Sequence, residues 1–186
     1  MKGWTIFGVI ALVVVAIIVA VIGGYNGLVT QNEDVNSKWA QVENQLQRRG
    51  DLIPNLVNTV KGYASHEQAA IQAVADARTK LAGAEGVANK AEASNELSGA
   101  LSRLLMVVEN YPNLKADQNF RALQDELAGT ENRLAVARKD YNDVVQVFNT
   151  KVKTIPTSIY AGMLGFSQRE YFKVDEAAKQ NPQVNF

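Results

Sequence analysis

The side chains that could carry chemistry are few and scattered. His66 is the only histidine, and Glu67 follows it. A zinc-protease helix needs a second histidine four positions after the first, so that both ligands share one face. Ala70 stands at that position. The dipeptide therefore predicts no metal site, and a surface histidine on a helical bundle is the simpler interpretation.

The carboxylates also lack the spacing that catalysis or a di-iron centre needs. Di-iron helical bundles carry Glu-x-x-His pairs, and none occurs in this sequence. There is no cysteine, no glycine-rich phosphate loop and no Gly-x-Ser-x-Gly elbow. We therefore predict no enzyme and no cofactor. The scattered carboxylates include Asp51, Glu67, Glu109, Glu126, Glu131 and Asp140.

Two groups of polar residues stand next to apolar lines and are the candidate functional residues. Caps and solvated helix faces explain most such groups. The alternative is a buried polar network that fixes helix register, or a surface for a partner. The candidates are Arg48, Arg49, Asp51, Glu131, Asn132, Arg133, Arg138 and Asn142.

The segment Trp4–Gly24 has no charged residue and no proline. A bilayer core needs about 20 apolar residues in a helix, so this run predicts a membrane-spanning anchor. A cleaved signal peptide has a shorter apolar core and a small-x-small cleavage site, and a soluble core helix is rarely apolar all round. We therefore expect an anchor over residues 1–24, in contact with the lipid bilayer through residues 4–24, and a domain over residues 25–186.

The distribution of basic residues around the span only slightly favours one orientation. Lys2 and the free amine precede the span, and Lys38 is the one lysine soon after it. Basic residues tend to stay in the cytoplasm. We expect a single-pass protein whose domain lies outside the cytoplasm.

The rest of the chain has a helical composition, and its zero formal net charge offers no basic surface for nucleic acid. Apolar stripes predict an all-α fold, an elongated up-and-down four-helix bundle with short helices at the C-terminus. The clearest stripe has a residue every seven positions, as in a coiled coil: Phe120, Leu127, Leu134, Tyr141 and Phe148. The first of the four helices is expected to end near Arg49. The other three are expected to span residues 52–82, 89–110 and 115–152.

The segment around Pro54 allows two interpretations. Gly50 as a helix stop, Asp51 as an N-cap and Pro54 in a first turn favour a chain reversal. However, a seven-residue apolar phase continues through the proline and is broken only at Glu67. A helix kinked at Pro54 preserves that phase, which gives the alternative of three long helices.

The C-terminal end carries one further helix signal. Ser167 and Glu170 form a capping-box pattern, which predicts a last helix to about Gln180. The tail Gln183–Phe186 ends on a large apolar residue, and we expect this tail to pack against the bundle.

Several motifs together resemble the LemA family. They are Trp39-Ala40-Gln41-Val42-Glu43, Arg48-Arg49-x-Asp51-Leu52-Ile53-Pro54-Asn55-Leu56-Val57, Tyr63-Ala64-x-His66-Glu67, Tyr111-Pro112-x-Leu114-Lys115, Glu131-Asn132-Arg133, Ala137-Arg138-x-x-Tyr141-Asn142 and Pro182-x-Val184-x-Phe186. The resemblance implies a bacterial inner-membrane protein with one N-terminal anchor, a helical domain and no established enzymatic activity. A magnetosome-membrane relative implies a connection to membrane shaping.

These features lead to two functional hypotheses. The first is a non-enzymatic scaffold that forms a homo-oligomer and organises the membrane or partner proteins. The alternative is an anchored adaptor or sensor that binds an envelope protein or a ligand.

Overall fold

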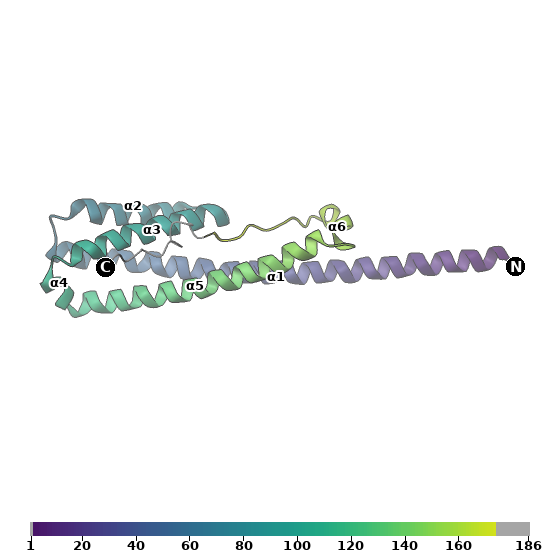
Figure 1. The fold of residues 1–186 in the computed structure, drawn as a ribbon, viewed down its shortest axis with the longest axis horizontal. Helices are drawn as coiled ribbons and strands as arrows, with labels where there is room; N and C mark the ends of the chain where they lie inside the picture. The colour runs from purple at the N-terminus through teal and green to yellow at the C-terminus, as the bar shows by residue number, and fades with distance from the viewer. Residues whose placement is uncertain (1, 174–186) are drawn as a thin grey trace, which may run out of the picture. The chain divides into compact units, whose positions relative to one another are not determined.

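The computed structural model describes residues 2–173, without the side chains of Lys2 and Thr5, and confirms the all-α prediction. Across these residues the helices are α1 (Lys2–Tyr63), α2 (Gln68–Gly83), α3 (Gly86–Val108), α4 (Pro112–Ala116), α5 (Gln118–Lys153) and α6 (Thr157–Tyr160), followed by the 3₁₀ turn η1 (Gly162–Leu164). No strand occurs among them (Figure 1).

The chain forms two compact units, and α1 and α5 each contribute to both. The bundle unit contains residues 39–141 and the described residues after 169. The anchor unit contains the described residues up to 38, together with residues 142–169.

The bundle unit consists of α1 from Trp39 onward, α2, α3, the short α4, and α5 up to Tyr141. Successive long helices reverse direction, and α2 runs beside α3 (Figure 1). Its apolar core takes residues from every one of these helices, as the apolar stripes require. The buried apolar side chains of these helices include Val42, Leu46, Ile53, Leu56, Val60, Ile71, Val74, Leu81, Leu97, Leu104, Leu114, Phe120, Leu134 and Tyr141.

The predicted chain reversal at Gly50–Pro54 is wrong, because α1 continues through Pro54 to Tyr63. A proline inside a helix has no N–H to offer the carbonyl four residues earlier, which is that of Gly50. Arg78 on α2 supplies the missing donor, since its Nε lies 2.8 Å from the Gly50 oxygen. The helix is therefore stabilised at its weakest point by a neighbouring helix.

The chain reverses instead at residues 64–67, so the single helix predicted over residues 52–82 is also wrong. Tyr63, the last residue of α1, is exposed, and its hydroxyl donates a hydrogen bond to Asp117 at 2.9 Å. The Tyr111 hydroxyl donates to Glu67 at 2.9 Å. Both bonds join this turn to the connection between α3 and α5, so long-range contacts stabilise the reversal.

The helices α3 and α5 lie within a few residues of their predicted positions. Asp117 caps α5, because its Oδ1 accepts a hydrogen bond from the Phe120 N–H at 2.9 Å. In the seven-residue line of α5, Leu127 is half-buried, whereas the other four members are buried.

The anchor unit begins with the apolar segment of α1. Within the described residues, α1 is the one helix long and apolar enough to cross a membrane, and its most apolar window is not buried. Beyond that segment, Leu28 and Val35 of α1 and Val145 and Phe148 of α5 are the buried apolar residues of this unit's two long helices. The Phe166 ring contacts Tyr25 and Phe148, with centroid distances of 5.8 and 6.4 Å.

The helix predicted from Ser167 does not form in the described residues, because residues 166–173 are not helical. Asn149 of α5 is buried and bonds both backbone groups of Arg169, accepting at 2.7 Å and donating at 2.8 Å. These bonds replace those that a helix would make there. The remainder of the predicted helix and the tail Gln183–Phe186 lie outside the described residues.

Candidate functional site

Two buried arginines of the bundle unit share one carboxylate. Arg49 on α1 is 5% exposed and Arg138 on α5 is 8% exposed. Arg49 Nη1 lies 2.9 Å from Glu131 Oε2, and Arg138 Nη1 lies 3.7 Å from Glu131 Oε1. Ser98 and Ser94 of α3 accept hydrogen bonds from Arg49 at 3.1 Å and from Arg138 at 2.8 Å. We call these five residues the arginine cluster.

Burial determines the electrostatics of this cluster. Burial lowers the pKa of the Arg49 guanidinium, and the Glu131 carboxylate opposes that shift. The pKa of Arg138 is also lowered by burial, while Glu131 raises it and Arg49 lowers it further. An arginine retains its proton under such shifts, so the cluster holds two positive charges against one negative charge. Among the described residues, Glu131 is the carboxylate that faces both buried cations, so its removal is unfavourable.

Aromatic rings complete the environment of Arg138. Its guanidinium carbon lies 4.8 Å from the centroid of the Phe172 ring, within the range of a cation–π interaction. Trp39 packs on Tyr141 and Phe172, with centroid distances of 5.2 and 6.4 Å. The arrangement holds α1, α3, α5 and the segment after Glu170 in one register.

A second set of charges lies exposed on the bundle unit. Glu126 Oε1 is 2.6 Å from Arg48 Nη2 and 3.0 Å from Arg133 Nη2. The hydrogen bond from Arg48 is the largest cause of the lowered pKa of Glu126. Exposed ion pairs contribute little to stability because water screens them. This triad is therefore a surface feature.

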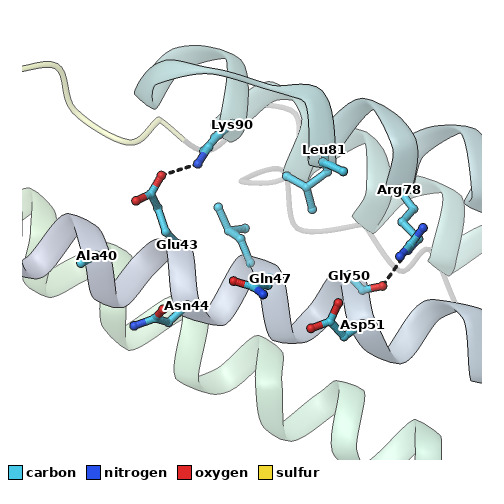
Figure 2. Close-up of a pocket in the computed structure, with 11 residues that line it drawn as sticks. Ala40, Glu43, Asn44, Gln47, Gly50, Asp51, Arg78, Leu81 and Lys90 are labelled. Carbon is cyan, nitrogen blue, oxygen red and sulfur yellow. Dashed lines mark hydrogen bonds and ion pairs between the residues drawn. The ribbon is translucent and has the colours of Figure 1, made fainter.

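A groove of about 470 Å³ lies between α1 and the pair α2 and α3, and we call it the α2 groove (Figure 2). Lys90 pairs with Glu43, and Arg78 bonds the Gly50 carbonyl. Apolar side chains, including Leu46 and Leu81, also line it, and Asp51 is exposed along it.

A second groove of about 530 Å³ lies between α1 and α5, and we call it the α5 groove. Val136 is one of its lining residues and is 60% exposed. Gln45, another lining residue, has a buried side-chain oxygen that no described donor reaches. A buried acceptor without a partner is unfavourable.

The structure distributes the eight candidate residues over several places. Three of them, Arg49, Glu131 and Arg138, meet in the arginine cluster, and Arg48 and Arg133 meet on Glu126. Arg133 also lines the α5 groove with Asn132, Asp51 lines the α2 groove, and Asn142 belongs to the anchor unit.

Sequence reasoning missed the residues of α2 and α3 that face these sites. Ser94 and Ser98 stand four positions apart beside the apolar residue Leu97. This spacing places both serines on one face of a helix next to the core, and it could have indicated that they take part in a buried site. Arg78 and Lys90 carried no comparable signal, because a single basic residue on a helix is usually solvated.

The arrangement of side chains indicates a structural use of charge. Within residues 2–173, no group of three or more His, Cys, Asp or Glu side chains is placed to hold a metal ion. His66 lies exposed in the turn after α1. The arginine cluster joins helices, and the grooves offer surfaces for binding.

The exposed apolar start of α1 and the helical bundle define the class of this protein, a membrane-associated all-α protein. The family model "LemA family" matches residues 38–186, which is more than half of the chain. The chain therefore belongs to the LemA family.

The chain is also similar to named relatives. Magnetosome protein MamQ 2 of Paramagnetospirillum magneticum is 29% identical over 188 residues, covering 87% of this chain and 69% of the relative. Magnetosome protein MamQ of Magnetospirillum gryphiswaldense is 28% identical over 188 residues, with the same two shares. Protein LemA of Metamycoplasma hominis is 20% identical over 156 residues, covering 83% of this chain and 71% of the relative.

Proposed function

We propose that this protein is a membrane-anchored, non-enzymatic helical scaffold that self-associates and organises the membrane or partner proteins. Its anchor is the apolar run Trp4–Gly24 at the start of α1. The relatives named MamQ are magnetosome proteins, which supports a role at a membrane. We further propose that the membrane is the bacterial inner membrane and that the bundle lies outside the cytoplasm.

The observation that carries self-association is the α5 groove. An exposed valine and a buried acceptor without a described partner, Val136 and Gln45, line the same groove. A helix of a second copy lying in this groove would bury the exposed valine, and burying apolar area favours association.

The test is the mass of the full-length protein in mild detergent, for the wild type and for Val136→Lys. We expect a defined oligomer for the wild type and a smaller species for Val136→Lys, with unchanged helical content because the side chain is exposed. Val147→Lys is the matched control, since Val147 is a similarly exposed valine of α5. A monomeric wild type, or a Val136→Lys protein with the wild-type mass, would refute self-association through this groove.

The side of the membrane can be tested in cells. The sequence contains no cysteine, so Met106→Cys creates a single exposed thiol on α3. A membrane-impermeant maleimide should label this thiol in spheroplasts. Labelling only after lysis would place the bundle in the cytoplasm.

A second candidate function is an anchored adaptor that binds an envelope protein or a ligand. The α2 groove favours it, because a volume of about 470 Å³ lies within the range of ligand sites and its walls carry both charge signs. A protein that stays monomeric at every concentration, with Val136→Lys indistinguishable from wild type, would favour this candidate.

A further inference from the structure

The anchor unit exposes four large apolar side chains on one short segment. Ile155 is 81% exposed, Ile159 is 70% exposed and Met163 is 87% exposed, and Leu164 is also exposed. The segment comprises α6, η1 and the residues just before α6, and we call it the apolar hook (residues 155–164). Exposed apolar residues that gather in this way mark an interaction surface.

The hook lies beside the end of the apolar run of α1. The Tyr160 hydroxyl occupies the position where a Cβ on Gly24 would stand, and Gly24 is the last residue of that run. The ring of Tyr25, the next residue, contacts the ring of Phe166 just after the hook, in an edge-on arrangement. The four exposed side chains are therefore carried by a segment that packs where α1 leaves the hydrocarbon core.

Between Asp143 and Glu170, the segment that carries the hook has charges of one sign only. Residues 144–169 contain no aspartate or glutamate, and they contain Lys151, Lys153 and Arg169. Residues 25–32 of α1 carry no charge at all. The Lys151 ammonium lies against α1, since a Cβ on Gly27 would be 2.6 Å from its Nζ. A surface that is basic and apolar but has no carboxylate is complementary to anionic lipid headgroups.

We propose that the apolar hook inserts into the leaflet from which α1 emerges, and that Lys151 and Lys153 contact the lipid phosphates. The hook is then a second lipid contact, separate from the span and contributed by a distant part of the sequence. Interfacial segments of this kind enter about 5–10 Å into the boundary between headgroups and acyl chains. This inference rests on the anchoring of residues 4–24, which belongs to the proposed function.

A lipid surface is a better occupant of the hook than a second copy of the chain. The hook is continuous with a segment that already requires lipid, whereas a second copy would have to cover it at the level of the headgroups. The absence of carboxylates also has a direct reason at an anionic membrane surface, because carboxylates there would be repelled.

The test uses single cysteines in the full-length, otherwise cysteine-free chain, each labelled with an environment-sensitive fluorophore. The labelled proteins are reconstituted in vesicles of equimolar phosphatidylcholine and phosphatidylglycerol. Met163→Cys reports on the hook. Met106→Cys is the matched control, because Met106 is an exposed methionine of α3 in the bundle unit, 65% exposed. Val13→Cys reports on the span.

We expect the label at residue 163 to be quenched by a lipid with a nitroxide just below the headgroup and to be shielded from aqueous iodide. The label at residue 106 should be open to iodide and should not be quenched by this lipid or by a lipid with a nitroxide near the acyl-chain end. The label at residue 13 should be quenched by a nitroxide near the acyl-chain end. This combination supports the proposal.

Three other results would overturn it, and each has a different meaning. If residue 163 is as open to iodide as residue 106 while residue 13 is quenched, the hook is wrong and the anchor stands. If residue 13 is not quenched, the anchor fails and the hook fails with it. If residue 163 is shielded from iodide, is not quenched by either lipid, and becomes open when the protein is diluted in lipid, the hook is a contact between copies.

The lysines have a separate readout. Lys151→Gln together with Lys153→Gln should reduce the shallow quenching at residue 163 in the anionic vesicles, relative to the same chain without these changes. In vesicles of phosphatidylcholine alone, the two proteins should be quenched equally. An equal response in both kinds of vesicle would exclude the phosphate contact.

Discussion

Arg78→Met tests how α1 remains helical at Pro54. The Gly50 carbonyl has no helical donor, because Pro54 has no N–H. Its partner is Arg78 Nε of α2, at 2.8 Å. Methionine retains much of the apolar stem and removes the donor. The substitution should therefore remove one hydrogen bond to one carbonyl, with little change in packing.

The magnitude of the loss follows from the type of bond and its exposure. A hydrogen bond to a charged group contributes about 1.5–3 kcal/mol. Gly50 is half-buried and lines the α2 groove, so water can replace part of the lost bond. We expect Arg78→Met to lower the free energy of unfolding by about 1–2 kcal/mol, around and slightly below the lower end of that range.

Pro54→Ala gives the second arm of a double-mutant cycle. Alanine restores the N–H that the Gly50 carbonyl lacks, and proline costs a helix interior about 3 kcal/mol relative to alanine. Because Arg78 already offsets part of that cost, we expect Pro54→Ala to stabilise the bundle by about 1–2 kcal/mol. In this background, Arg78→Met should cost about 1 kcal/mol less than in the wild type.

The assay is urea unfolding of the full-length protein in mild detergent, followed by tryptophan fluorescence. The chain has two tryptophans, and a Trp4→Phe background leaves Trp39, which packs on Tyr141 in the bundle unit. Arg103→Met is the control, because Arg103 is an exposed arginine of α3 and its loss should be nearly neutral. The reasoning is refuted if Arg78→Met costs the same in both backgrounds, or if Pro54→Ala destabilises the bundle.

Three further predictions concern other contacts. Glu131→Gln removes the carboxylate that faces two buried arginines, and we expect the free energy of unfolding in urea to fall by about 2–3 kcal/mol. This is below the usual range for a buried pair, because the Glu131 side chain is 42% exposed. A fall of less than about 0.5 kcal/mol would contradict this role. Asn149→Ala removes both bonds to the Arg169 backbone and should raise hydrogen exchange at the Arg169 amide, whereas unchanged exchange would show that other contacts hold the segment. The pKa of Asp117 is lowered chiefly by the hydrogen bond from the Phe120 N–H. The ionised Asp117 carboxylate therefore stabilises the fold fully above the ordinary aspartate pKa of about 3.9, and this stabilisation is lost as the pH falls through the lowered pKa. Asp117→Asn should retain the cap and remove that acid-dependent loss, which urea midpoints measured against pH would detect.

Much of the helical architecture could be predicted from the sequence, because local patterns determine it. The run Trp4–Gly24 is long and apolar enough to cross a membrane, and it lies exposed at the start of α1. The seven-residue line of α5 predicted its buried face from Phe120 to Phe148. In both segments the decisive signal is where the apolar side chains fall along the helix, and the geometry of a helix is known in advance.

Only part of the candidate site could be predicted from the sequence. The polar groups around Arg49 and Glu131 were conspicuous, but their spacing could not show that Arg49, Glu131 and Arg138 share one charge network. Ser94 and Ser98 complete that network from α3. Which faces of α1, α3 and α5 meet depends on packing between residues far apart in the chain.

Tertiary structure also decided where the chain turns and where it does not. Around Pro54, the capping residues favoured the end of a helix, whereas the seven-residue apolar spacing favoured a continuous helix, and these two signals were nearly balanced. Arg78 of α2 favours continuation by bonding the one carbonyl that proline leaves without a donor. Asn149 acts in the opposite sense after Phe166, since its bonds to the Arg169 backbone take the place of helical ones. Every backbone polar group needs a partner. The sequence by itself determines which groups lack a local partner, and only the folded chain determines which distant side chain supplies one.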